Sequence, residues 1–186
     1  MARQILFLQG GGKGARDADA LMVAKLKRNL AAPDIRFPTM PEEADPDYSR
    51  WKPAIEHELG RLKEGAIVIA HSLGASFLLK LFTGAVIGKP PAGLFLLAAP
   101  YWGGAGWRYE GFEQVALRAD YAEALPRAPI RFYHCRDDAV VPFAHLALYA
   151  ADVPRAEVRA FDTGGHQFNS RLGEVAADVE ALAGTH

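Results

Sequence analysis

The sequence predicts an α/β protein with one doubly wound sheet of six strands, mostly or wholly parallel, covered by helices on both faces. Short apolar runs alternate with longer amphipathic runs along the chain. Three of the six short runs are apolar throughout, which is typical of strands buried on both faces. Such alternation joins parallel strands through right-handed crossovers. The 186 residues, 50% of them hydrophobic, are expected to form a single domain over 1–186.

Each element follows from its local pattern. The strands are expected at Ile5–Leu8, Ile35–Phe37, Ala66–Ala70, Leu94–Ala99, Ile130–Cys135 and Val158–Phe161. The helices are expected at Asp17–Leu30, Tyr48–Lys63, Ser72–Thr83, Phe143–Ala151 and Leu172–Leu182. In the second helix, Trp51, Ile55 and Leu59 recur at helical spacing, which predicts a buried face. Glu58 is expected on the opposite, exposed face.

Composition excludes several classes of function. The 21 basic and 22 acidic residues are mixed along the chain, which argues against nucleic acid as a partner. No apolar run approaches the roughly 18 residues of a membrane span, so no membrane partner is expected. The N-terminus lacks the apolar core of a signal peptide, and a cytoplasmic location is therefore expected. The single cysteine, Cys135, can form neither an internal disulfide nor a zinc site, and no metal is expected.

A nucleophile elbow is the strongest motif. The third strand, "AIVIA", runs directly into "HSLGAS", which puts Ser72 between a strand and a helix. Ala70 and Gly74 are small, as the sharp turn requires two residues before and two residues after the nucleophile. The alternative is that Ser72 only caps the following helix. The steric pattern on both sides of the serine exceeds what a cap needs, so Ser72 is predicted to be the nucleophile.

Candidates for a base and its orienting acid follow the last two strands. A serine nucleophile requires both, in the chain order Ser, Asp, His for this kind of fold. "CRDDAVVPF" follows the fifth strand and "FDTGGHQF" follows the sixth. His166 is therefore the predicted base, and either Asp137 or Asp138 the acid, while the other aspartate fixes the turn through backbone N–H groups. His71 lies within the elbow and is expected to point away from the site.

These motifs together resemble the α/β-hydrolases of the minimal, lidless kind, and are similar to the small serine hydrolases of the retinoblastoma-binding-protein-9-like group. The resemblance includes the glycine turn after the first strand, the tryptophan-bearing "DYSRWKPAIEHEL", and the segments "AHSLGAS", "DDAVVP" and "GGH". It implies the strand order 2-1-3-4-5-6. The family pattern G-x-x-D-x-x-V-P maps onto Cys135, Asp138, Val141 and Pro142, which implies that Asp138 is the acid.

Two positions depart from the family pattern. Gln9-Gly10 stands where the family has His-Gly after the first strand. The L-x-C-x-E motif of the human member is absent around Cys135, so that protein's binding partner is not carried over.

The glycine turn "FLQGGGKGARDADAL" admits two interpretations. Gly10, Gly12 and Ala15 fit the G-x-G-x-x-G/A dinucleotide fingerprint, but that site needs an acidic residue about 20 positions further on, where Pro38 to Pro41 follow the second strand. In the α/β-hydrolase arrangement the same turn supplies one oxyanion N–H, and the residue after the nucleophile supplies the other. Gly11 and Leu73 are the residues predicted for these two roles.

The sequence thus predicts a serine hydrolase, carboxylesterase-like, that acts on a small-molecule ester or related acyl bond through an acyl-enzyme. No cofactor is implied, and the oligomeric state is not predicted. The expected pocket residues are Tyr101, Trp102, Trp107 and Phe143. The alternative for these aromatic residues is that they fill the core beneath an irregular loop. The alternative function is an interaction module that kept the fold and lost catalysis.

Overall fold

The computed structural model describes residues 4–31, 33–84, 88–108 and 112–183. Within these residues, six strands form one sheet in the order β2-β1-β3-β4-β5-β6, and every neighbouring pair is parallel. The strands are β1 (Gln4–Leu8), β2 (Asp34–Arg36), β3 (Ile67–His71), β4 (Gly93–Leu97), β5 (Ile130–Cys135) and β6 (Glu157–Phe161). The predicted fold class and strand order are confirmed.

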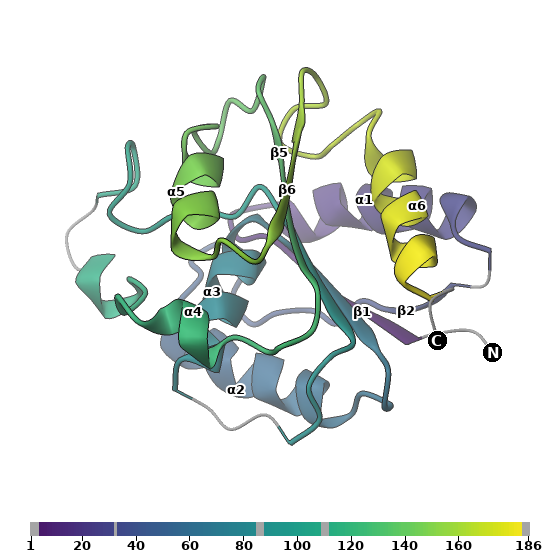
Figure 1. Ribbon diagram of the computed structural model, residues 1–186, viewed down its shortest axis with the longest axis horizontal. Coiled ribbons are helices and arrows are strands. Elements are labelled where there is room, and N and C mark those ends of the chain that lie inside the picture. The colour runs from purple at the N-terminus through teal and green to yellow at the C-terminus, as the bar shows by residue number, and fades with distance from the viewer. Residues whose placement is uncertain (1–3, 32, 85–87, 109–111, 184–186) are drawn as a thin grey trace.

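Helices cover both faces of the sheet (Figure 1). One face carries α1 (Ala15–Asn29) and α6 (Leu172–Ala183), which contact each other. The other face carries α2 (Tyr48–Gly60), α3 (Ser72–Phe82) and α5 (His145–Asp152). A 3-10 turn, η1 (Phe112–Gln114), and the short helix α4 (Tyr121–Ala124) were not predicted. None of the helices in the described ranges is long and apolar enough to cross a membrane.

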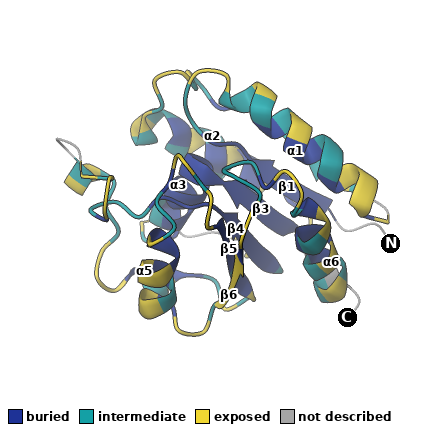
Figure 2. Ribbon diagram, turned by 90° about the horizontal axis from the view of Figure 1, so that it is seen from above, coloured by how far each residue is buried: buried dark blue, intermediate teal, exposed yellow. Residues whose placement is uncertain are grey.

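Burial is greatest in the centre of the sheet (Figure 2). Every residue of β1, β3 and β4 is buried, as expected for apolar strands covered on both faces. The edge strand β6 is exposed along most of its length, and only Phe161 is buried. The buried centre of the sheet therefore includes β3, the strand that leads into the elbow.

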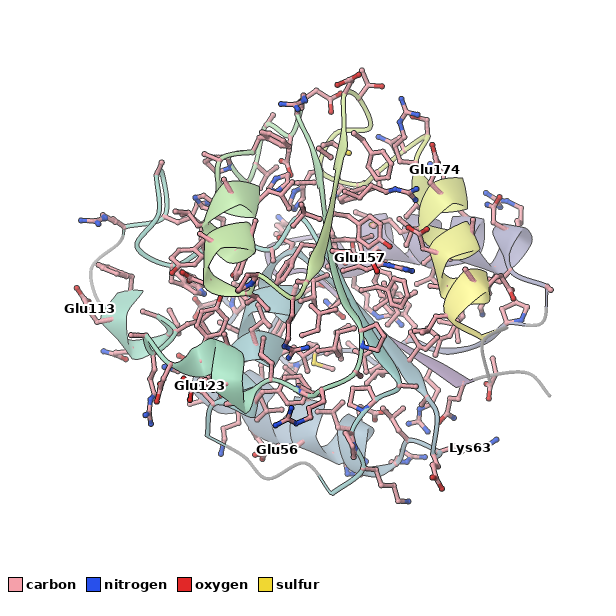
Figure 3. All side chains as sticks on the ribbon, in the orientation of Figure 1. Glu56, Lys63, Glu113, Glu123, Glu157 and Glu174 are labelled. Carbon is pink, nitrogen blue, oxygen red and sulfur yellow. The ribbon has the colours of Figure 1, made fainter. Side chains whose placement is uncertain are left out.

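Side chains on the helices follow the predicted amphipathic pattern with one correction. Trp51, Ile55 and Leu59 of α2 are buried. The charged side chains of Glu56 on α2 and Glu174 on α6 lie toward the outside of the molecule (Figure 3). The expectation that Glu58 is exposed was wrong: its side chain is buried against the sheet edge, where it pairs with Arg36 of β2.

Candidate active site

The elbow has the backbone geometry that its residue pattern requires. Ser72 follows β3 without a connecting residue and begins α3. Its φ of 49° lies in the left-handed region, which residues other than glycine rarely adopt. A Cβ atom added at Gly74 would lie 2.2 Å from the carbonyl oxygen of Gln9, so only glycine fits two positions after the serine. The turn holds Ser72 in a strained conformation at the carboxyl end of a fully buried strand.

The structure brings together the three side chains predicted for the triad. Ser72 Oγ lies 3.0 Å from His166 Nε2, and His166 Nδ1 lies 2.8 Å from Asp138 Oδ2. Asp138 follows β5 and His166 follows β6, while Ser72 follows β3. Because all strands are parallel, their carboxyl ends meet at one edge of the sheet, and residues 94 positions apart become neighbours there.

Asp138 is held in place as an ionised carboxylate. Its Oδ1 atom accepts the backbone N–H groups of Val140 at 2.8 Å and Val141 at 3.0 Å, and its Oδ2 atom lies 3.2 Å from His134 Nε2. Burial by itself raises the pKa of this carboxyl group, but the hydrogen bonds from His134 and His166 outweigh burial and lower the pKa well below its usual range. A carboxylate at this position keeps the proton of His166 on Nδ1 and leaves Nε2 free to accept the hydroxyl proton of Ser72.

The neighbouring Asp137 has a different structural role. Its two carboxylate oxygens accept the N–H groups of Gly164 at 3.1 Å and Gly165 at 2.8 Å. These glycines immediately precede His166, so Asp137 fixes the turn that carries the histidine. The imidazole ring of His166 is instead hydrogen-bonded to Asp138.

His166 is set up to be neutral at pH 7. Burial lowers the pKa of the His166 imidazole, the hydrogen bond that the ring donates to Asp138 raises this pKa, and the positive charge of the neighbouring His71 lowers it again. The net pKa is below the ordinary value for histidine. A neutral imidazole with an unprotonated Nε2 is the form that can act as a base.

Two of the three N–H groups in the glycine turn are bonded to acceptors. Gly10 N–H is bonded to Asp19 Oδ2 at 2.7 Å, and Gly12 N–H to the carbonyl oxygen of Glu43 at 2.6 Å. Among the residues that the structure describes, no acceptor takes the N–H of Gly11 or of Leu73. A Cβ atom at Gly11 would lie 2.5 Å from Leu73 Cδ2, so the turn packs directly on the residue that follows the nucleophile. The two residues predicted as oxyanion donors are therefore neighbours.

A pocket of about 480 Å³ opens beside Ser72 and His166. The glycine turn borders it on one side, and Phe77, Trp102 and Trp107 line an apolar part. Trp102 stacks on Phe77 and meets Trp107 edge to face, with ring centroids 6.4 and 5.1 Å apart. Of the four predicted pocket residues, the two tryptophans line this pocket.

The structure does not bring Tyr101 or Phe143 to the pocket. The Tyr101 hydroxyl donates to Asp152 Oδ2 at 2.6 Å. Phe143 packs beneath the guanidinium of Arg136, 4.6 Å from its ring centroid. The Tyr101 ring packs against Tyr149 of α5 and the Phe143 ring against His134, so both aromatic residues cover the core instead of lining the pocket.

One polar pair beside the triad was missed. His71 was expected to point away from the site, but it borders the same pocket as Ser72 and His166. Its Nδ1 lies 2.9 and 3.1 Å from the two carboxylate oxygens of Asp19, and its Nε2 lies 2.9 Å from the backbone oxygen of His166. A signal was present in the sequence: Asp19 occupies the same helical stripe as the apolar Met22 and Leu26. A carboxylate in a buried stripe requires a partner.

Two other chemistries find little support among the described residues. No group of three or more His, Cys, Asp or Glu side chains in them could hold a metal ion. Burial raises the pKa of the Cys135 thiol to about 12, so the thiolate that a cysteine nucleophile needs is scarce at neutral pH.

A family profile described as "Serine hydrolase" matches residues 24–176, a range that contains all three triad candidates. The chain belongs to the serine hydrolase family. No curated protein sequence matches this serine hydrolase.

Solved structures share the fold over nearly the whole chain. The ydeN gene product from B. subtilis is 18% identical, with a TM-score of 0.76 over 98% of this chain and 99% of that chain. TT1662 from Thermus thermophilus is 17% identical, with a TM-score of 0.72 over 100% and 90% of the two chains. Est1E from Butyrivibrio proteoclasticus is 12% identical, with a TM-score of 0.69 over 98% and 87%. At these identities the likeness establishes the α/β-hydrolase fold alone.

Proposed function

We propose that this serine hydrolase cleaves an ester or related acyl bond in two steps, with Ser72 as nucleophile, His166 as general base and acid, and Asp138 as the group that orients His166. One observation carries the proposal. The hydrogen bonds that Ser72 Oγ donates to His166 Nε2 at 3.0 Å and that His166 Nδ1 donates to Asp138 at 2.8 Å form a continuous chain that begins on a serine in a strained turn. A merely structural serine needs neither the base nor the strain.

The reaction follows from the protonation states. Ser72 Oγ attacks the carbonyl carbon as its proton passes to His166 Nε2, and the N–H groups of Gly11 and Leu73 receive the oxyanion of the tetrahedral intermediate. The intermediate collapses, and His166 returns the proton to the leaving alcohol. A water molecule then attacks the acyl-enzyme by the same route, which releases the acid and restores Ser72.

The pocket supports a small apolar acyl group as substrate. Trp102, Trp107 and Phe77 offer aromatic surface, and the Trp102 indole N–H is already bonded to Ser76 Oγ at 3.2 Å. A carboxylesterase-type activity on short or aromatic acyl chains fits these features. The proposal includes one catalytic domain and the closer resemblance to the retinoblastoma-binding-protein-9-like group, which the elbow and Gly-Gly-His motifs support.

The first test is the intact mass of the protein after exposure to a fluorophosphonate. We expect one adduct on the wild type and none on Ser72→Ala. Ser170→Ala, at an exposed serine away from the pocket, is the matched control and should retain the adduct. Hydrolysis of short p-nitrophenyl esters by the same three proteins then measures turnover.

The opposite outcome is equally informative. An adduct that persists on Ser72→Ala would move the nucleophile elsewhere. A folded wild-type protein that resists both a bulky and a small fluorophosphonate would contradict catalysis and favour the interaction module.

A further inference from the structure

A second histidine–aspartate pair lies directly beside the triad and borders the same pocket. Asp19 and His71 are both almost completely buried, and the rings of His71 and His166 have centroids 4.6 Å apart. The pair contributes nothing to the proton chain from Asp138 to Ser72. Its position next to the catalytic ring nevertheless demands an explanation, because burying two ionisable groups is costly unless each has a partner.

The atoms around His71 determine its protonation. The Nε2 atom faces the carbonyl oxygen of His166 at 2.9 Å, and a carbonyl oxygen only accepts hydrogen bonds. The Nδ1 atom faces the carboxylate of Asp19, another acceptor, at 2.9 Å. Both ring nitrogens must therefore donate, which makes His71 an imidazolium. Burial by itself lowers the pKa of this ring, but Asp19, the carbonyl of His166 and the charge of Asp138 together outweigh burial and keep the pKa above its ordinary value.

The pair also connects three segments that are distant in the sequence. Asp19 of α1 accepts the N–H of Gly10, which immediately precedes the proposed oxyanion donor Gly11. His71 immediately precedes Ser72 and donates to the backbone of His166. The glycine turn, the elbow and the histidine loop are thus joined through two side chains.

We infer that Asp19 and His71 form a positioning ion pair for the proposed hydrolysis: it aligns the oxyanion turn with the histidine loop, and the His71 cation opposes protonation of His166. The inference rests on the proposed function, because it assigns the base role to His166. A neutral His166 is then maintained by the charge behind its ring as well as by burial.

The charged surroundings of His166 set the sign of the effect. Asp138 favours the protonated ring and His71 opposes it, while Asp19, on the far side of His71, favours it more weakly. Further out, His134 contacts Asp138, and Lys13 and Asp47 line the pocket. If the Asp19–His71 pair is neutralised, the nearer cation disappears together with the more distant anion. The ring of His166 then becomes easier to protonate.

Asp19→Asn isolates this charge. The amide oxygen can still accept the Gly10 N–H, and the amide nitrogen can donate to Nδ1 of a neutral His71, so the bonding is kept while the charge is lost. Asp17→Asn, the same change at an exposed position of α1, is the matched control. Histidine ring protonation is followed by ¹H–¹⁵N NMR in the wild type and both variants, and the acidic limb of kcat/KM is measured on a p-nitrophenyl ester.

We expect wild-type His71 to remain doubly protonated at pH 8, and His166 to titrate at a higher pH in Asp19→Asn than in the wild type or Asp17→Asn, with the acidic limb of kcat/KM moving in the same direction. A singly protonated His71 in the wild type, or an unchanged His166 titration in Asp19→Asn, would overturn the inference. If Asp19→Asn does not fold, the protonation state of His71 in the wild type still tests the inference. The NMR result is independent of turnover, so loss of the proposed function, reported by fluorophosphonate labelling, is distinguished from failure of this inference.

Discussion

The two histidine–aspartate pairs of this serine hydrolase have the same chemical components and opposite roles. His166 lines the pocket, where one nitrogen of its imidazole faces Asp138 and the other faces the hydroxyl group of Ser72. Asp19 and His71 are almost completely buried beside them, where the second nitrogen of His71 faces a backbone carbonyl. A hydroxyl can donate, so a neutral His166 can accept a hydrogen bond from Ser72 through Nε2, as the proposed base requires. A carbonyl cannot donate, so we infer that His71 is charged.

The comparison teaches that a histidine next to an aspartate is not by itself a base. Whether such a histidine can act as a base depends on the atom that its second ring nitrogen faces and on whether substrate can reach that nitrogen. The predictions below test the difference between the pairs, from the largest expected effect to the smallest.

Removal of the imidazole at the pocket should have the largest effect. We expect His166→Ala to lower kcat by a factor of about 10⁴ or more, because Ser72 loses its base, while the melting temperature changes little. The measurement is p-nitrophenyl ester hydrolysis together with a thermal melt. His57→Ala, at an exposed position of α2, should retain full activity. If His166→Ala were as active as the wild type, His166 would not be the base, and the proposed difference between the two histidine–aspartate pairs would be wrong.

Substitution of the two adjacent aspartates, Asp137 and Asp138, should lower kcat by very different factors. Asp138→Asn is expected to lower kcat by a factor of about 10⁴, because the amide favours the wrong tautomer of His166. Asp137→Asn should lower kcat by only about tenfold, because it loosens the glycine turn and shifts the histidine slightly. The measurement is kcat for both variants at pH 8. A larger loss for Asp137→Asn would transfer the role of acid to Asp137.

Substitution of a residue that lines the pocket should change KM. Trp102→Ala removes aromatic surface that a substrate acyl group can bury, and we expect KM for an apolar ester to rise about tenfold. Tyr101→Phe, whose hydroxyl bonds to Asp152 away from the pocket, should leave KM within about twofold of the wild-type value. Equal effects of the two changes would contradict the pocket boundary described above.

The pH dependence of the wild type should give the smallest and most specific effect. The proposed base is neutral His166, so kcat/KM should fall as the pH drops through the pKa of its ring. Burial, opposed by Asp138 and assisted by His71, sets that pKa below the ordinary value of 6.5. We therefore expect a plateau at neutral pH and an acidic midpoint below 6.5, measured as kcat/KM against pH at constant ionic strength. A midpoint above 6.5 would indicate that the charge of His71 does not act on the base.

Several features could be predicted because their causes are local in the sequence. Alternation of apolar and amphipathic runs indicates strands and crossover helices, and the small residues around Ser72 follow from the sterics of one turn. Parallel strands bring their carboxyl ends together, so the positions of Asp138 and His166 after β5 and β6 were sufficient to make them candidates. The sequence alone therefore determined the sheet, its order through the family resemblance, and the chemistry expected at its edge.

Only the tertiary structure decided the contacts between side chains that no local pattern links. Asp19 and His71 are 52 positions apart, and Glu58 is buried by Arg36 of the edge strand rather than exposed. Tyr101 lies away from the pocket because its hydroxyl bonds to Asp152 of α5. Periodicity reports which face of an element is apolar, whereas the partner of a buried charge depends on which elements the fold brings against that face.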